Sequence, residues 1–81
     1  MAGRMVGVHI GTIVNNIDPL SRGRAQVRIP ALASAASSWA LVCRPFGAAA
    51  GAGGPTIGAQ VVVAFENGDP DSPIILGSIP S

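Results

Sequence analysis

The sequence predicts an all-β domain folded as a small five-stranded antiparallel barrel, and three observations lead to this prediction. Five short apolar runs alternate with turn signals along the 81 residues, and 11 Gly and 7 Pro punctuate the whole chain. No window has the sustained periodicity of an amphipathic helix. The length allows a single domain, residues 1–81, with a core over about residues 6–78.

The first two runs have the alternation expected of strands. In residues 6–14, Val6, Val8, Ile10, Thr12 and Val14 share one face, and the glycines on the other face suggest a bend or a close backbone approach. In residues 24–29, Arg24, Gln26 and Arg28 alternate with apolar residues, which indicates a half-solvated strand. Asn15-Asn16 and Asp18-Pro19 supply turn chemistry between the two runs.

The other three runs occupy residues 39–44, 60–65 and 73–79. Residues 60–65 are apolar on both faces, which is typical of a strand covered on both sides. In so short a chain, we expect the second cover to come from another subunit. Residues 31–38 favour at most a short helical turn, and residues 47–54, almost pure Gly and Ala, predict a flexible loop.

Barrel closure is favoured because five open strands would leave two unpaired edges. The OB-fold is the five-stranded barrel of this size, and an SH3-like barrel fits almost as well.

Composition indicates a need for partner subunits. Charged residues make up 11% of the chain, against about 25% in typical soluble domains. A single cysteine, Cys43, excludes an intrachain disulfide, and one His with one Cys cannot close a zinc site. The net charge of +1 gives no polyelectrolyte drive toward nucleic acid. We expect neither a transmembrane span nor a signal peptide.

The sequence predicts no enzyme, no cofactor and no metal site. His9 lies in mid-strand without a nucleophile elbow, so a structural role is expected. Cys43 lies in an apolar run, which predicts a buried and inert thiol. Glu66, Asp69 and Asp71 stand beside Gly or Pro, as turn-forming acids do. The absence of lysine excludes a P-loop in the Gly/Ala segment.

Arg24 and Arg28 share one face of the second strand. This face is either an anion-binding stripe, a solvated surface, or a surface that pairs with acids of a neighbouring subunit. A module that binds single-stranded nucleic acid or oligosaccharide is therefore the alternative function, although the chain offers few aromatic residues for stacking.

Two segments are more specific than any general barrel pattern. One is VVVAFENGDPDSPIILGSI at residues 61–79, and the other joins residues 13–30 to SWALV at residues 38–42. In this order they resemble the OB-fold domain of phage baseplate assembly protein V and of VgrG-type spike proteins of type VI secretion. The turn motif of this resemblance consists of Phe65, Gly68, Asp69, Pro70, Pro73, Leu76 and Gly77.

The motif residues have physical roles of their own. Gly68 can adopt a positive φ, Asp69 can cap its own turn, and Pro73 can open a strand. Trp39, with Phe65, is expected to anchor the core because these rings carry the largest apolar areas. The resemblance implies contacts with other copies of the chain, in a trimer, or with the hub protein that ends the inner tube. The candidate residues for such an interface are Arg24, Arg28, Val62 and Ile75.

The resemblance implies a homotrimer on the axis of a contractile tail or injection machine. There the chain would be a plug or adaptor between the tube hub and a separate tip or needle protein, and would contact a membrane only through the assembled machine. The implied location is a virion tail, a baseplate or an assembled injection particle. Most relatives continue into a β-helical needle, whereas this sequence ends at Ser81, so puncture by the chain itself is not expected.

Overall fold

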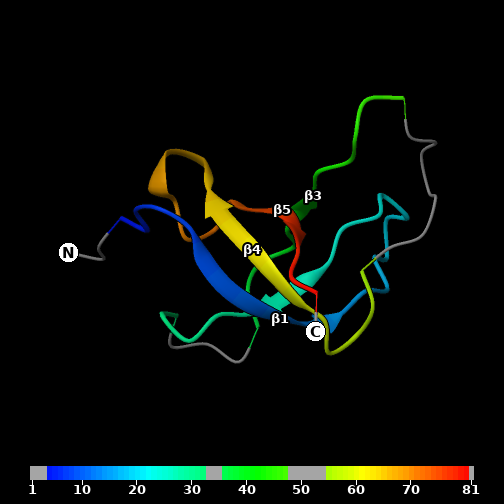
Figure 1. The fold of residues 1–81 in the computed structure, drawn as a ribbon, viewed down its shortest axis with the longest axis horizontal. Coiled ribbons are helices and arrows are strands. Elements are labelled where there is room, and N and C mark those ends of the chain that lie inside the picture. The colour runs from blue at the N-terminus through cyan, green and yellow to red at the C-terminus, as the bar shows by residue number, and fades with distance from the viewer. Residues whose placement is uncertain (1–3, 33–35, 48–54, 81) are drawn as a thin grey trace.

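The strands of the protein form one curled sheet. The computed structural model describes residues 4–32, 36–47 and 55–80. The strands are β1 (His9–Asn15), β2 (Gln26–Arg28), β3 (Leu41–Val42), β4 (Gln60–Phe65) and β5 (Pro73–Ser78), and one 3-10 turn, η1 (Glu66–Gly68), follows β4 (Figure 1). The described residues contain no α-helix, so the all-β prediction is confirmed.

The two edges of the curled sheet meet where residues 25–27 lie against residues 37–40. Its strand order is β2-β1-β4-β5-β3, which leaves β2 and β3 at the two edges. Ala25, just before β2, and Ala40, just before β3, join these edges with reciprocal N–H to O=C bonds of 3.2 and 2.7 Å. Both alanines are fully buried, so small side chains allow the two edges to meet. The ring order is consistent with the predicted OB-fold.

One strand pair departs from the predicted antiparallel arrangement, because β3 and β5 run parallel. A closed ring with an odd number of strands cannot alternate direction at every step. At least one neighbouring pair must therefore run in the same direction. The all-β barrel prediction is confirmed, and its purely antiparallel character is corrected to a mixed sheet.

The core confirms the predicted alternation of the second strand, whose apolar residues are all buried. In β1 the inward face is the one with Gly11 and Ile13, and Val8, Ile10 and Val14 are exposed. A side chain at Gly11 would overlap Val27, so this glycine permits the expected close approach between strands. The core residues are Ile13, Ala25, Val27, Ile29, Ala40, Val61, Val63, Phe65 and Ile75.

The structure places Ile75 and Trp39 differently from the expectation. Ile75 is 2% exposed, because it pairs with the inward residue Val63, so it is a core residue and not an interface residue. Trp39 is half-buried and lies outside the core cluster, so the core anchor is Phe65. The expected flexible loop at residues 47–54 lies outside the described residues except for Gly47, and the expected helical turn at residues 31–38 lies partly outside them, since residues 33–35 are not described.

Candidate interaction surface

The residues with catalytic potential lie on different elements: His9 in β1, Cys43 just after β3, and the acids in the turn between β4 and β5. In the described part of the chain, no group of three or more His, Cys, Asp or Glu residues could hold a metal ion. His9 is half-buried, and its ring meets Phe65 edge to face at 5.5 Å between centroids. Cys43 is exposed, so the prediction of a buried thiol was wrong. Val42 packs against the core, and strand alternation turns the next residue outward.

The outer face of the sheet carries two uncharged rows of residues. Directly paired residues on neighbouring strands point to the same side of a sheet. The first row crosses β1, β4 and β5 as Ile10, Val62 and Gly77. The second row crosses β4, β5 and β3 as Ala64, Ile74 and Leu41. Ile10 is 47% exposed and Leu41 is 57% exposed, so the chain leaves much of this apolar face to solvent.

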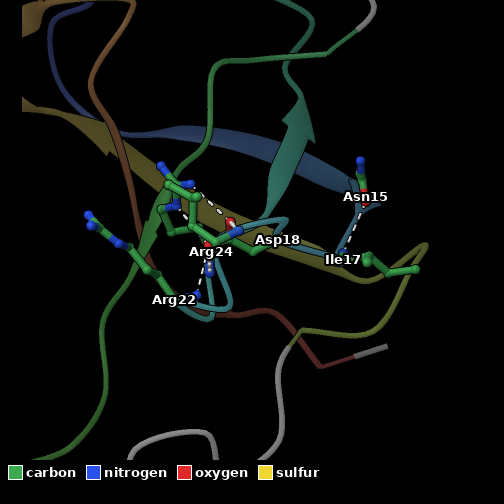
Figure 2. A network of polar contacts seen from close by, with 6 residues as sticks. Asn15, Ile17, Asp18, Arg22 and Arg24 are labelled. Atoms are coloured by element: carbon green, nitrogen blue, oxygen red, sulfur yellow. Dashed lines mark hydrogen bonds and ion pairs between the residues drawn. The ribbon is translucent and has the colours of Figure 1, made fainter.

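The loop between β1 and β2 is organised around one carboxylate, that of Asp18 (Figure 2). Asp18 accepts hydrogen bonds from the backbone N–H groups of Leu20, Arg22 and Arg24 at 2.9, 3.0 and 3.3 Å. The Arg24 guanidinium donates two more, at 2.8 Å from Nε and 2.9 Å from Nη2. The Asp18 side chain is only 2% exposed, so the carboxylate lies enclosed by its own loop.

This ion pair changes the prediction for the arginine face. The hydrogen bonds from Arg24 hold the pKa of Asp18 well below its usual value, despite the opposing effect of burial, and they raise the pKa of Arg24. The Arg24 guanidinium also lies 5.6 Å from the centroid of the Trp39 ring. Arg24 thus pairs with an acid of its own chain, and it is not part of an open stripe with the exposed Arg28.

Two asparagines attach this loop to its neighbours. The Asn15 side chain accepts a hydrogen bond from Ile17 N–H at 3.0 Å, and its amide donates to Gln26 at 3.1 Å. Asn16 donates to the Pro55 carbonyl at 2.9 Å, which connects the β1–β2 loop to the segment before β4. Sequence reasoning assigned a turn here but missed the enclosed carboxylate, since Asp-Pro by itself indicates only a turn.

The turn between β4 and β5 has the structure that the sequence indicated. Gly68 has φ 73°, and Asp69 accepts hydrogen bonds from Asp71 N–H at 2.9 Å and from the Ser72 hydroxyl at 3.3 Å. The N-terminal segment lies against this turn, since Met5 N–H donates to the Gly68 carbonyl at 2.8 Å. The Arg4 guanidinium donates to the Asn67 carbonyl at 2.7 Å, a contact that the sequence did not reveal.

The chain matches one known family over most of its length. The model of a family described as the type VI secretion system/phage-baseplate injector OB domain matches residues 9–79. The chain belongs to this family. No curated protein gave a significant match. The suspected resemblance is confirmed, and the protein is a structural component of a phage baseplate or of a related injection machine.

In this injector OB domain, the motif residues are divided between two places. Phe65 and Pro73 pair across the ends of β4 and β5, and residues 66–72 form the turn between them. Leu76 and Gly77 lie where the register between β4 and β5 shifts, opposite Val62 on the outer face. Within the described residues, no helix has the length and hydrophobicity needed to span a membrane.

Proposed function

We propose that this injector OB domain is a homotrimeric plug or adaptor between the tube hub and a separate tip or needle protein. The observation that carries the proposal is a pair of neighbouring uncharged rows on the outer face of the sheet, which a third row of Gln60, Thr12 and the exposed Arg28 flanks. The solvated face of an antiparallel sheet ordinarily carries polar side chains. Here its two rows consist of Ile10, Val62 and Gly77, and of Ala64, Ile74 and Leu41.

The occupant that suits this face is a second copy of the same chain. Contact between copies through these two rows would bury apolar area, and the rows themselves contain no charged group whose burial would cost free energy. Cyclic symmetry closes such contacts into a ring of finite size. The low proportion of charged residues, 11%, supports a chain whose surface is partly covered in its working state.

The proposed role requires binding and no catalytic step. The family supports the location in a baseplate or injection machine, and a trimer would present a three-fold platform to proteins above and below it. Any contact with a membrane would be made through the assembled machine.

The oligomeric state tests this proposal. We expect light scattering of the pure protein at micromolar concentration to give the mass of three chains. Ile10→Glu should give single chains, because it places a charge in the proposed contact, and circular dichroism should confirm that the variant folds. The control is Leu20→Glu, since Leu20 is 60% exposed in the β1–β2 loop and lies outside the sheet face. Single chains of the unsubstituted protein, both in solution and in purified particles, would contradict the trimer.

The nucleic-acid alternative can be tested separately. We expect no binding of a single-stranded oligonucleotide at low salt, because Arg24 already pairs with Asp18 and stacks on Trp39. Salt-sensitive binding that is lost in Arg28→Ala would favour the alternative instead.

A further inference from the structure

The two ends of the barrel differ in charge. Figure 1 shows the β4–β5 turn at one end of the long axis and the β1–β2 loop, in cyan, at the other. The turn carries three exposed acids, Glu66, Asp69 and Asp71. At the loop end, Arg22 is exposed, and a side chain at Gly23 would lie 2.8 Å from Nη2 of Arg44. The carboxylate of this loop, Asp18, is neutralised by Arg24, so the loop end has a positive balance.

The loop end also exposes large apolar side chains. Ile17 is 79% exposed and Leu20 is 60% exposed, both in the β1–β2 loop. Ile57 is 53% exposed in the adjoining segment, which the Asn16–Pro55 hydrogen bond holds against the loop. Arginine is enriched among the residues that contribute most to binding at protein interfaces, and the exposed apolar side chains beside it offer apolar area that a partner can bury.

The loop is held in one conformation although the core does not require it. None of the residues 16–24 belongs to the buried core cluster. Asp18 nevertheless accepts three backbone hydrogen bonds and two from Arg24. Ser21 has φ 54°, a left-handed conformation that costs free energy in a residue with a side chain. A loop fixed in advance loses less conformational entropy when it binds, which raises affinity.

We propose that the β1–β2 loop is a docking element for another protein of the injection machine. Ile17 and Leu20 insert into an apolar socket of that protein, and carboxylates at the rim of the socket pair with Arg22. This inference rests on the proposed adaptor function, because the assembled machine supplies the partner. It adds the chemistry of the partner surface, which is acidic around an apolar centre.

A second copy of the chain fits this loop less well than a different protein does. The exposed acids of the chain lie at the opposite end of the barrel, so pairing them with Arg22 would require end-to-end contacts. Repeated contacts of that kind between opposite ends produce open filaments and not a closed plug. Asp69 is also engaged already by Asp71 N–H and the Ser72 hydroxyl.

Site-specific photo-crosslinking in assembled particles tests the inference. A benzophenone side chain is placed at Leu20 in the bacterium that produces the particles, and the irradiated, purified particles are analysed by mass spectrometry. We expect an adduct with a different protein, on a peptide that contains Asp or Glu. Arg22→Glu should lower its yield at least about tenfold, because it sets like charges against each other, and Arg22→Lys should retain most of it. The matched control carries the same label at Leu41, which the proposed trimer assigns to a copy of the chain.

The outcomes separate the docking element from the trimer. The docking proposal is overturned if the Leu20 label joins only copies of this chain, if it gives no adduct, or if Arg22→Glu leaves the yield unchanged. If the Leu20 label joins another protein in an Arg22-dependent manner while the Leu41 label finds no copy, docking stands and the trimer fails.

Discussion

The β1–β2 loop and the β4–β5 turn contain the same dipeptide in two different settings. Asp18-Pro19 begins a loop in which the carboxylate is 2% exposed and paired with Arg24. Asp69-Pro70 lies in a tight turn in which the carboxylate is exposed and accepts two hydrogen bonds from Asp71 and Ser72. Each segment also has one non-glycine residue at positive φ, Ser21 in the loop and Asn67 in the turn.

The difference shows how chain length around an aspartate decides its role. In the turn, β5 begins four residues after Asp69, so the carboxylate reaches only its nearest neighbours. In the loop, ten residues separate β1 from β2, and the backbone can wrap three N–H groups and one guanidinium around Asp18. The turn is therefore stabilised only by contacts between neighbouring residues, whereas the whole loop is arranged around the Asp18 carboxylate.

Removal of each carboxylate should give the largest difference in stability between the loop and the turn. Asp69→Ala loses two exposed hydrogen bonds, so we expect unfolding to become easier by about 0.5–1.5 kcal/mol. Asp18→Ala leaves three N–H groups and the Arg24 guanidinium without their acceptor, so its loss should be at least about twice as large. Urea denaturation of both variants measures the contrast.

The double variant Asp18→Ala/Arg24→Ala is the control for this comparison. It should be no less stable than Asp18→Ala alone, since the guanidinium that lost its partner is also removed. Equal losses for Asp18→Ala and Asp69→Ala would show that the enclosed carboxylate does not organise the loop.

Acidification should remove the contribution of the Asp18 carboxylate to folding stability without any substitution. Because Arg24 depresses the pKa of Asp18 in the folded protein, the stabilisation is complete above the ordinary aspartate pKa of about 3.9 and is lost as the pH falls below it. The stability difference between the native protein and Asp18→Asn should stay constant from about pH 7 to 5 and shrink below about pH 4. Thermal unfolding at each pH measures the difference. In an Arg24→Met background the folded-state pKa of Asp18 should be less depressed, so the narrowing should be smaller and should end at a higher pH; identical profiles in the two backgrounds would exclude Arg24 as the cause.

The same contrast explains what the sequence could predict. The Asp69-Pro70 turn, the bounds of β4 and the alternation of the second strand depend on neighbouring residues, and each was predicted. The Asp18–Arg24 pair depends on the path of a whole loop, which a dipeptide does not specify. The positions of Ile75 and Cys43 could not be assigned because an apolar run without alternation does not show which face is inward.

Alanine at the glycines of the two segments should give a smaller difference in stability between the loop and the turn. Gly68 and Gly23 have φ of 73° and 72°, where a side chain costs roughly 1–2 kcal/mol. A Cβ at Gly68 would also lie 3.0 Å from Arg4 Cβ and 3.5 Å from Met5 N, whereas at Gly23 it would lie 2.8 Å from Nη2 at the far end of the Arg44 side chain, away from any backbone atom. Gly68→Ala should therefore be the more destabilising of the two in urea denaturation.

Gly58→Ala is the matched control for these glycines. Gly58 has φ 88° and a Cβ there would meet nothing within 4 Å, so the variant reports the backbone cost alone. Gly23→Ala should lower the free energy of unfolding by about as much as Gly58→Ala does. If Gly68→Ala is no more destabilising than Gly58→Ala, residues 4 and 5 do not support the turn. The hydrogen bonds within the turn are then sufficient to hold its conformation.

The smallest contrast concerns the two non-glycine residues at positive φ. Asn tolerates the left-handed conformation better than Ser, because its side chain can hydrogen-bond locally, so the loop stores more strain at Ser21 than the turn does at Asn67. Glycine relieves this strain but raises the entropy of the unfolded chain, which opposes the gain by about 0.4–1 kcal/mol. We expect Ser21→Gly to be neutral or slightly stabilising and Asn67→Gly to be slightly destabilising, a separation of about 0.5 kcal/mol in parallel urea titrations. The opposite order would place the greater strain in the turn, and Ser21 would then no longer support a loop whose conformation is maintained for binding.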